Sequence, residues 1–298
     1  MTNSSSTGII QKRAKKYINL KKFNKKSKTN LIYEFNITKY EQIKLQSECF
    51  KFIKDNFKKH KIKTTNKSRE YLLKNLDSIH TYTHNGALKP KKETIESYKK
   101  IVYLLINFLE KNFINNEIKS ITLPNVRIIR DNKKLNNHKL GNKDTRILHT
   151  DIWVGQTGSG IFNLGIYGDF KNSSVKYYDI FKFKKNYLKK YNKFQDAQKN
   201  IIKKKYFTKL KIGKAVYFDL LIPHNTFTRK NGKNRVSIDF CISLKNKIKK
   251  NSDFCYFDLN KLKYNLRNKE IYCRSSILDA KKDNHFFNDG ILFKKNSS

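Results

Sequence analysis

The sequence predicts an α+β protein in which N-terminal helices pack outside one sheet of a β-sandwich or jelly-roll barrel. Between residues 31 and 118 apolar residues recur mostly at helical intervals, whereas from about residue 120 to 245 they form short alternating runs between turn residues. Helices followed by strands argue against a doubly wound parallel sheet, in which the two would alternate. With 13% aromatic residues among 298, the chain can also bury a sizeable core.

The chain is expected to form a single domain preceded by a short arm. Residues 1–30 carry nine Lys or Arg and no acid. They are predicted to be a mobile basic arm, because like charges repel and little apolar surface is available to bury. Residues 31–298 then form one domain. It divides into a helical part at 31–118, a jelly-roll core at about 120–245 and a C-terminal segment at 250–298 that wraps around the domain.

Three helices are predicted in the N-terminal part. Apolar residues between 40 and 59 recur mostly at helical spacing, and a second short helix covers Ser68 to Ile79. The third begins just after Pro90. Its apolar stripe steps by three, four, three and four residues, through Ile95, Tyr98, Val102, Leu105 and Leu109.

Six strands are predicted in the core, with one helical insertion among them. The insertion covers about residues 184–205, where apolar residues at helical spacing are mixed with many lysines. The strands are inferred from short apolar runs that alternate with polar residues. They are Ile121–Ile129, Arg146–Val154, Ile161–Tyr167, Ser174–Ile180, Lys209–Leu221 and Arg235–Leu244.

The net charge of +42 raises the question of an anionic partner. Of the 66 basic residues nine are Arg, which leaves 66 − 9 = 57 Lys, a profile typical of AT-rich codons. Base reading and bidentate phosphate contact favour Arg, so nucleic acid is not expected as the partner, and a basic nucleic-acid-binding protein is kept as an alternative. The lysines would equally suit an anionic small-molecule substrate, such as a phosphorylated or nucleotide-linked sugar.

No run approaches the roughly 20 apolar residues of a membrane helix, and the N-terminus has no apolar core of a secretory signal. A cytoplasmic location without a membrane span is therefore expected. The cysteines include no CxxC pair and no disulfide framework, so they are predicted to be reduced core residues. They are Cys49, Cys241, Cys255 and Cys273.

Three residues in two short segments can bind a metal ion together. His149 and Asp151 stand at positions i and i+2, and on a strand such residues face the same side at roughly 6.6 Å separation. His224, after Pro223, ends another strand-like run and can supply the third ligand. Two imidazoles and one carboxylate on one face of an octahedral ion suit Fe(II) and O₂ chemistry. The alternative for each histidine is an ordinary hydrogen-bonded role, but the conjunction favours the metal.

The last predicted strand carries a polar face. Arg235, Ser237 and Asp239 alternate with apolar residues, so they share one side of the strand. A buried arginine needs an anion, and its planar fork fits a carboxylate, with the Ser237 hydroxyl as an added donor. An ion pair between Arg235 and Asp239 is the structural alternative.

Six short motifs between about 120 and 245 bear a family likeness: Pro124-Asn125-Val126-Arg127-Ile128, His149-Thr150-Asp151, Asn172-Ser173-Ser174, Gly213-Lys214-Ala215-Val216-Tyr217-Phe218, Pro223-His224 and Arg235-Val236-Ser237-Ile238-Asp239-Phe240. With them the sequence resembles the iron(II)/2-oxoglutarate-dependent oxygenases, and among these the phytanoyl-CoA-dioxygenase-like enzymes and oxygenases of sporadic carbohydrate-biosynthesis clusters. The resemblance implies a cupin-like double-stranded β-helix. It implies that His149, Asp151 and His224 form the catalytic centre as iron ligands, and that Arg235 and Ser237 anchor 2-oxoglutarate.

The resemblance also implies an enzyme, a dioxygenase that uses Fe(II), 2-oxoglutarate and O₂. Such an enzyme couples decarboxylation of 2-oxoglutarate to oxidation of a small molecule, here with a sugar or sugar nucleotide of surface-carbohydrate biosynthesis as the suggested substrate. Asn225 departs from the family pattern, which usually has glycine after the distal histidine. A catalytically inactive jelly-roll binding protein and a cupin-type isomerase stay open, and dependence on metal and 2-oxoglutarate separates the three.

Three neighbouring residues have two readings each. Trp153, the only Trp, is expected in the core rather than at a substrate platform. Asn163 and Tyr167 lie on the strand-like run after a Gly-rich turn. They either line the cofactor pocket or pack in the core.

Overall fold

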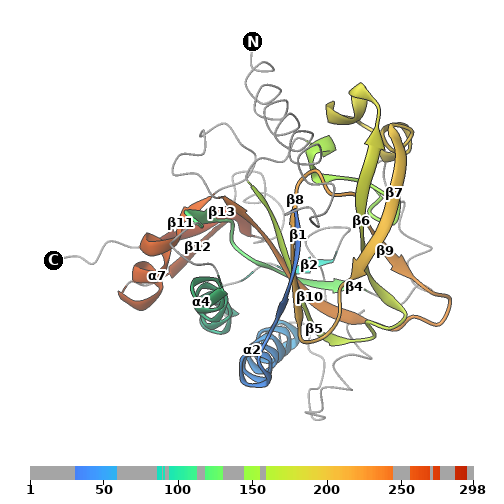
Figure 1. Ribbon diagram of the computed structural model, residues 1–298. Helices are drawn as coiled ribbons and strands as arrows, with labels where there is room; N and C mark the ends of the chain where they lie inside the picture. Colours follow the sequence, from blue (N-terminus) through green and yellow to red (C-terminus); the bar gives the residue numbers. More distant parts are fainter. Residues whose placement is uncertain are drawn as a thin grey trace.

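The computed structural model describes residues 31–58, 86–88, 90, 94–112, 118–129, 144–154, 159–243, 256–268, 271–275 and 286–293. The predicted arm at 1–30 and the predicted helix from Ser68 to Ile79 lie outside these described residues. Within them, helices combine with antiparallel sheets, which confirms the mixed α+β class (Figure 1).

The larger sheet is centred on β10 (Arg235–Ser243). One edge of β10 pairs with β5 (Gly160–Gly168), and the other pairs with both β3 (Ser120–Ile121) and β4 (Asn125–Ile129). The predicted strand Ile121–Ile129 is thus split in two, because Pro124 has no N–H to continue the ladder. The sheet is completed by β8 (Lys214–Asp219) beside β5, β1 (Ile32–Asn36) beside β8, β11 (Phe257–Asp258) beside β3, and β2 (Ala87–Leu88) beside β4.

The smaller sheet has the order β7 (Ile201–Lys209), β6 (Ser173–Phe183) and β9 (His224–Thr228). A two-stranded sheet near the C-terminus pairs β12 (Ile271–Ser275) with β13 (Phe286–Phe293). Between β6 and β7 the chain forms a 3₁₀ turn, η5 (Lys185–Leu188), and a short helix, α6 (Phe194–Gln198). The helix α7 (Leu259–Asn268) follows β11 and contacts α4.

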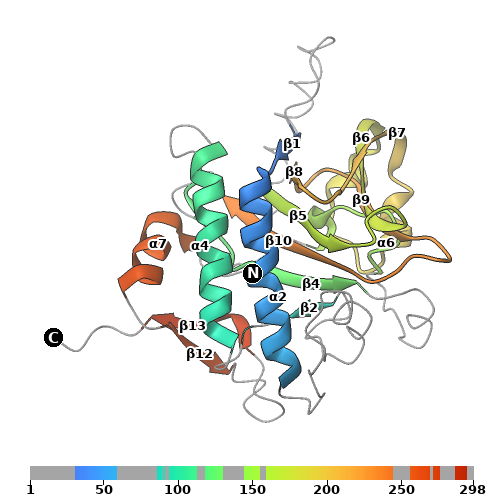
Figure 2. The same ribbon diagram turned by 90° about the horizontal axis from the view of Figure 1, so that it is seen from below.

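Two long helices cover one face of the larger sheet. They are α2 (Lys39–Lys58) and α4 (Ile95–Asn112), and Figure 2 shows them side by side across its strands. A capping box begins α2, since the Thr38 hydroxyl accepts from the Glu41 N–H while the Glu41 carboxylate accepts from the Thr38 N–H. The apolar stripe of α4 and the apolar face of β10, with Val236, Ile238 and Phe240, belong to one buried cluster. The sheet face toward the helices is therefore the main core, and its other face is left for the site.

Two of the predicted elements are wrong. The run Arg146–Val154 is not a strand, because only His149 makes an isolated bridge and Asp151–Val154 form the 3₁₀ turn η4. The predicted helical insertion at 184–205 is helical only in η5 and α6, because Ile201 and the residues after it pair with β6 as β7. The residues of β1, β2 and β9 were not predicted as strands.

Two smaller expectations can be compared with the described residues. Cys49 and Cys241 are buried, as predicted. No described helix is long and apolar enough to cross a membrane.

Candidate metal centre

His149 and His224 face each other across a short antiparallel bridge. The His149 N–H donates to the His224 carbonyl at 3.0 Å, and the His224 N–H donates to the His149 carbonyl at 2.8 Å. Directly opposed residues of an antiparallel pair project to the same face, so both rings enter the same space. The ring centroids lie 4.3 Å apart. This bridge, and not the predicted strand, brings the two imidazoles together.

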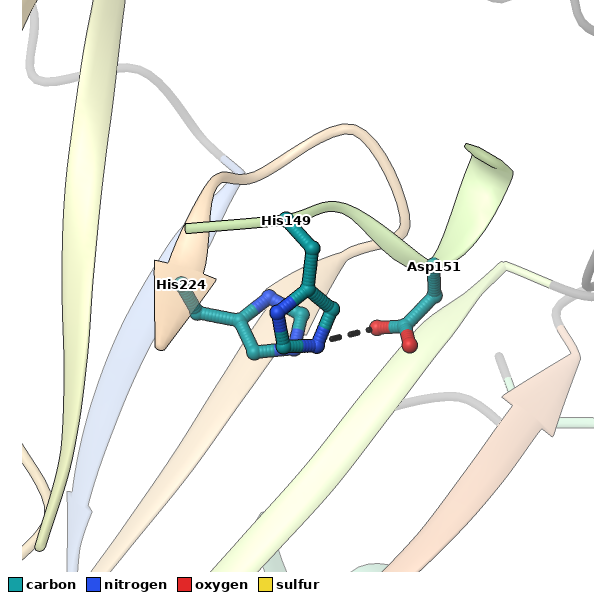
Figure 3. Close-up of side chains that lie close together, drawn as sticks. All are labelled: His149, Asp151 and His224. Atoms are coloured by element: carbon teal, nitrogen blue, oxygen red, sulfur yellow. Dashed lines mark ion pairs between the residues drawn. The ribbon is translucent and has the colours of Figure 1, made fainter. Parts of the chain in front are cut away.

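Asp151 reaches the same point from the first residue of η4. The Ile152 N–H donates to the Leu220 carbonyl at 3.3 Å and the Trp153 N–H donates to the Thr150 carbonyl at 3.1 Å, which holds the turn against the segment before His224. One ligand atom from each of His149, Asp151 and His224 lies within 4.8 Å of the others. Figure 3 shows the three side chains pointing toward one another. The three residues singled out from the sequence therefore do converge, although Asp151 is not on a strand.

Each of the two imidazoles is oriented by a contact between its Nδ1 and the backbone carbonyl two residues earlier. Nδ1 of His149 lies 2.8 Å from the Ile147 carbonyl, and Nδ1 of His224 lies 3.0 Å from the Ile222 carbonyl. A carbonyl can only accept, so each Nδ1 carries a proton and leaves the Nε2 lone pair free for a ligand. Burial lowers the pKa of both rings to about 4, so both are neutral at neutral pH. Neutral imidazole is the form that binds a metal.

The Asp151 carboxylate is enclosed, and the nearby charges compensate only part of its burial. Its Oδ2 lies 3.5 Å from His224 Nε2 and accepts no hydrogen bond from the described residues. Burial raises the pKa of Asp151 to about 6, because the charged form has little to stabilise it. A divalent cation between this carboxylate and two neutral Nε2 atoms would supply the missing charge. The donor set therefore fits a metal ion.

The three candidate ligands line a cavity of about 150 Å³, whose other lining residues come from both sheets. Val175 and Thr226 contribute from the smaller sheet, whereas Asn163, Arg235 and Ser237 contribute from the larger one. The alternation predicted for β10 is confirmed, since its polar face lines this cavity and its apolar face joins the main core. Ile129, Ile161 and Phe218 add apolar surface.

Arg235 brings a buried positive charge to the cavity. Its side chain is 1% exposed, and its guanidinium lies 5.3 Å from the ring centroid of Phe170. Among the described residues its hydrogen bonding is incomplete, because Nη1 donates to the Ser237 hydroxyl at 3.1 Å while Nε has no partner. Burial lowers the pKa of Arg235 to about 10, so the group is still protonated at neutral pH. A buried cation of this kind favours an anion in the cavity.

Asp239 does not pair with Arg235, contrary to the structural alternative considered for the sequence. It accepts from Arg127 on β4, with Nη2 at 2.9 Å from Oδ1 and Nε on Oδ2, and from the Asn125 amide at 3.0 Å. Both Arg127 and Asp239 line the cavity, and sequence reasoning assigned no role to Arg127. A signal was available, because Asn125 and Arg127 alternate with Val126 and Ile128 as a polar strand face.

The structure decides between a pocket role and a core role for Asn163, Tyr167 and Trp153. Asn163 lines the cavity and donates from Nδ2 to the Tyr177 hydroxyl at 2.7 Å. Tyr167 is buried in the main core cluster and is not part of the cavity wall. Trp153 is fully buried and donates from Nε1 to the Tyr187 carbonyl at 2.7 Å, so it is a core residue, as predicted.

Comparisons with known proteins give only distant likenesses. No protein-family model matches the sequence, and no curated protein matches it. Among solved structures, the non-heme alpha ketoglutarate-dependent carbocyclase SnoK from nogalamycin biosynthesis is 6% identical, with 78% of this chain and 85% of that chain covered and a TM-score of 0.40. The epimerase SnoN from the same biosynthesis is 8% identical, with coverage of 78% and 81% and a TM-score of 0.38. The non-heme monooxygenase ThoJ is 11% identical, with coverage of 70% and 71% and a TM-score of 0.35. Overlaps this loose carry no functional conclusion, which has to come from the site itself.

Proposed function

We propose that the protein is an Fe(II)- and 2-oxoglutarate-dependent oxygenase acting on a small molecule, built on a cupin-like jelly-roll core. The observation that carries the proposal is the pairing of two features in one cavity. A two-histidine, one-carboxylate ligand set lies at one wall, and a buried arginine without a carboxylate partner among the described residues lines the same space. Metal binding alone would not need the arginine, whereas a diacid that chelates the metal would use both.

Each residue has a defined role in this proposal. His149 and His224 would hold Fe(II) through Nε2, and Asp151 would hold it through its carboxylate, with their orientation fixed by the bridge and by η4. Arg235, assisted by Ser237, would bind the distal carboxylate of 2-oxoglutarate. Ile161, Val175 and Phe218 would keep water from the reacting atoms. When bound, iron and 2-oxoglutarate supply the oxidising chemistry with O₂, and the protein supplies placement.

The proposed substrate is an anionic small molecule, with a sugar phosphate or sugar nucleotide as the first candidate class. The second arginine of the cavity, Arg127, is already paired with Asp239, so the support comes from the charge of the whole chain. The chain as a whole carries a net charge of +42, which attracts anions over long range. Mass spectrometry after incubation of candidate sugars with Fe(II), ascorbate and 2-oxoglutarate should reveal a product heavier by one oxygen atom.

The ligand assignment is tested by replacing each ligand. His149→Ala, Asp151→Ala and His224→Ala should each abolish stoichiometric Fe(II) binding and the visible absorption band of the anaerobic iron–2-oxoglutarate complex, because two remaining ligands hold a labile divalent ion poorly. The control is Glu96→Ala, since Glu96 is an exposed carboxylate on α4 that pairs with Lys99 at 3.6 Å, away from the ligands. Wild-type iron content and an unchanged band in all three ligand variants would refute the assignment.

The co-substrate assignment has a separate readout. Wild-type protein should release succinate from 2-oxoglutarate only with Fe(II) and O₂, and the three ligand variants should not. A wild-type protein that binds iron but neither binds nor turns over 2-oxoglutarate would be a metal-dependent cupin of another class. That result would overturn the oxygenase proposal while keeping the metal site.

A further inference from the structure

The segment between β6 and β7, residues 185–198, packs behind the candidate metal ligands. We call it the insertion segment; it comprises η5, α6 and the residues joining them. Its buried side chains Tyr187, Phe194 and Ala197 form one apolar cluster with Ile152 and Trp153, which follow Asp151, and with Leu221, which precedes His224. The segment therefore touches both of the chain segments that carry the ligands.

Phe194 lies directly on the ring of His149. The two ring centroids are 4.4 Å apart and the ring planes differ by 10°, which is a stacked arrangement. Phe194 is 2% exposed and does not line the cavity, so it covers the ring without contacting the space where a ligand would bind. The Nδ1 contact to Ile147 fixes one edge of the imidazole, and the stacked phenyl ring fixes its plane.

Tyr187 connects the segment that carries Asp151 with the segment that carries His224. Its carbonyl accepts from the indole N–H of Trp153 at 2.7 Å, and its hydroxyl donates to the Leu221 carbonyl. Trp153 is two residues after Asp151, and Leu221 is three residues before His224. The Trp153 carbonyl in turn accepts from the Tyr191 N–H at 2.9 Å. Hydrogen bonds of this kind in a fully buried cluster hold both segments at a fixed separation.

We propose that Phe194 and Tyr187 are positioning residues for the metal centre: Phe194 fixes the plane of the His149 ring, and Tyr187 sets the distance between the segments carrying Asp151 and His224. This inference rests on the proposed function in that it assigns the three ligands to a metal. It gives the insertion segment a role in the chemistry, although none of its residues reaches the cavity wall. Loss of such second contacts typically weakens metal binding by about ten- to hundredfold.

The chain offers a matched control for each variant. Tyr98 is a buried tyrosine whose hydroxyl donates to the Pro124 carbonyl at 2.6 Å, and Phe52 is a fully buried phenylalanine 5.7 Å from the Tyr98 ring. Both belong to the main core around α2 and α4, away from the ligands. Tyr98→Phe and Phe52→Leu therefore remove the same groups from a buried site as Tyr187→Phe and Phe194→Leu.

The test uses two readouts, one of which needs no metal. In the metal-free protein with ¹³C-labelled histidine, the Hε1 signal that disappears in His149→Gln should lie upfield because of the Phe194 ring current. Phe194→Leu should remove that shift, and Phe52→Leu should keep it. Titration with Co(II), followed by its visible absorption, should show affinity reduced about ten- to hundredfold in Phe194→Leu. Tyr187→Phe should show a smaller loss, and both controls should bind like the wild type.

The outcomes separate the two proposals. An unshifted His149 signal in the wild type, or an equal loss of Co(II) affinity in the control variants, overturns the positioning role. A shifted signal that Phe194→Leu abolishes, in a wild-type protein that binds neither Co(II) nor Fe(II), supports the packing of His149 and overturns the metal site and the proposed function with it. Lowered stability alone would appear equally in the matched controls and would not reproduce the expected pattern.

Discussion

The two arginines of the cavity, Arg127 on β4 and Arg235 on β10, lie on neighbouring strands in opposite electrostatic situations. Arg127 binds both oxygens of Asp239, and the Asn125 amide holds the same carboxylate. Arg235 forms no ion pair with a carboxylate among the described residues and has one hydrogen bond, to Ser237. One buried guanidinium is thus paired with a carboxylate of the chain, and the other forms no ion pair among the described residues.

The pKa values of the two groups move in opposite directions for this reason. Burial lowers the pKa of Arg235 to about 10, and no nearby partner reverses it. Burial would also lower the pKa of Arg127, but the charge of Asp239 and its hydrogen bonds outweigh burial and raise it. An ion pair inside a protein contributes mainly by compensating its own desolvation, so Arg127 has the contacts of a structural group, whereas Arg235 lacks them, in keeping with the binding role proposed for it.

The largest expected effect comes from making Arg127 resemble Arg235. Asp239→Asn keeps the shape of the side chain but leaves the guanidinium of Arg127 without a counter-charge. Removing one partner of an enclosed pair should lower the free energy of unfolding by about 3 kcal/mol, as measured by urea denaturation of the ligand-free protein. The control, Asp196→Asn, removes an exposed pair with Lys199 and should change the stability by less than about 1 kcal/mol. Equal losses in the two variants would show that Arg127 does not depend on Asp239.

The second effect concerns 2-oxoglutarate. Arg235→Lys keeps one positive charge and loses the bidentate fork, so the affinity for 2-oxoglutarate should fall by roughly ten- to hundredfold, the equivalent of about 1.5–3 kcal/mol, with iron content unchanged. The readout is titration of 2-oxoglutarate against the absorption band of the iron complex. Arg229→Lys, at an exposed position after β9, is the control and should bind like the wild type. Unchanged affinity together with lost iron would make Arg235 a residue of the fold.

Removing the charge of Arg235 altogether should raise the free energy of unfolding, whereas breaking the Arg127–Asp239 pair should lower it. Arg235→Met replaces an uncompensated buried cation by an apolar side chain of similar length, so the ligand-free protein should be more stable by about 1 kcal/mol. Arg127→Met should be less stable, because it leaves Asp239 enclosed without its partner. Urea denaturation of both variants checks the contrast. A loss of stability in Arg235→Met comparable to that in Arg127→Met would mean that the two arginines are equivalent.

The sequence was sufficient to bring three candidate ligands together, but it did not reveal the role of Arg127 or the backbone that carries the ligands. His149, Asp151 and His224 converge as expected, but through a bridge and a 3₁₀ turn. The expected convergence is found although the assumed strand is absent, because the bridge at His149 and the turn η4 bring the same side chains together. Arg235 and Ser237 were predicted from alternation on β10, which is a regular strand between two neighbours, where alternation is most reliable.

The missed features depend on contacts between distant parts of the chain. β1 pairs with β8 about 180 residues later, for example Ile32 with Phe218, and no local pattern contains that pairing. The start of Ile201–Lys209 was predicted as helix because it continues a run of apolar residues mixed with many lysines, whereas pairing with β6 makes it a strand. The Arg127–Asp239 pair joins two strands 112 residues apart in sequence. Tertiary pairing decides such cases, and a single sequence does not display it.

The smallest expected effect is that of replacing Ser237, whose hydroxyl contacts Arg235 and can also contact a ligand. Its hydroxyl accepts from Arg235 Nη1 at 3.1 Å, so its own O–H proton is free to donate to a ligand carboxylate beside the guanidinium. Ser237→Ala removes one neutral donor to the ligand and one acceptor from Arg235. A neutral hydrogen bond contributes about 0.5–1.5 kcal/mol, so the affinity for 2-oxoglutarate should fall by roughly two- to tenfold, less than in Arg235→Lys. Ser243→Ala, at the buried far end of the same strand, should leave that affinity unchanged. If Ser237→Ala weakened 2-oxoglutarate as much as Arg235→Lys does, the hydroxyl would be the main contact and the arginine would serve chiefly to orient it.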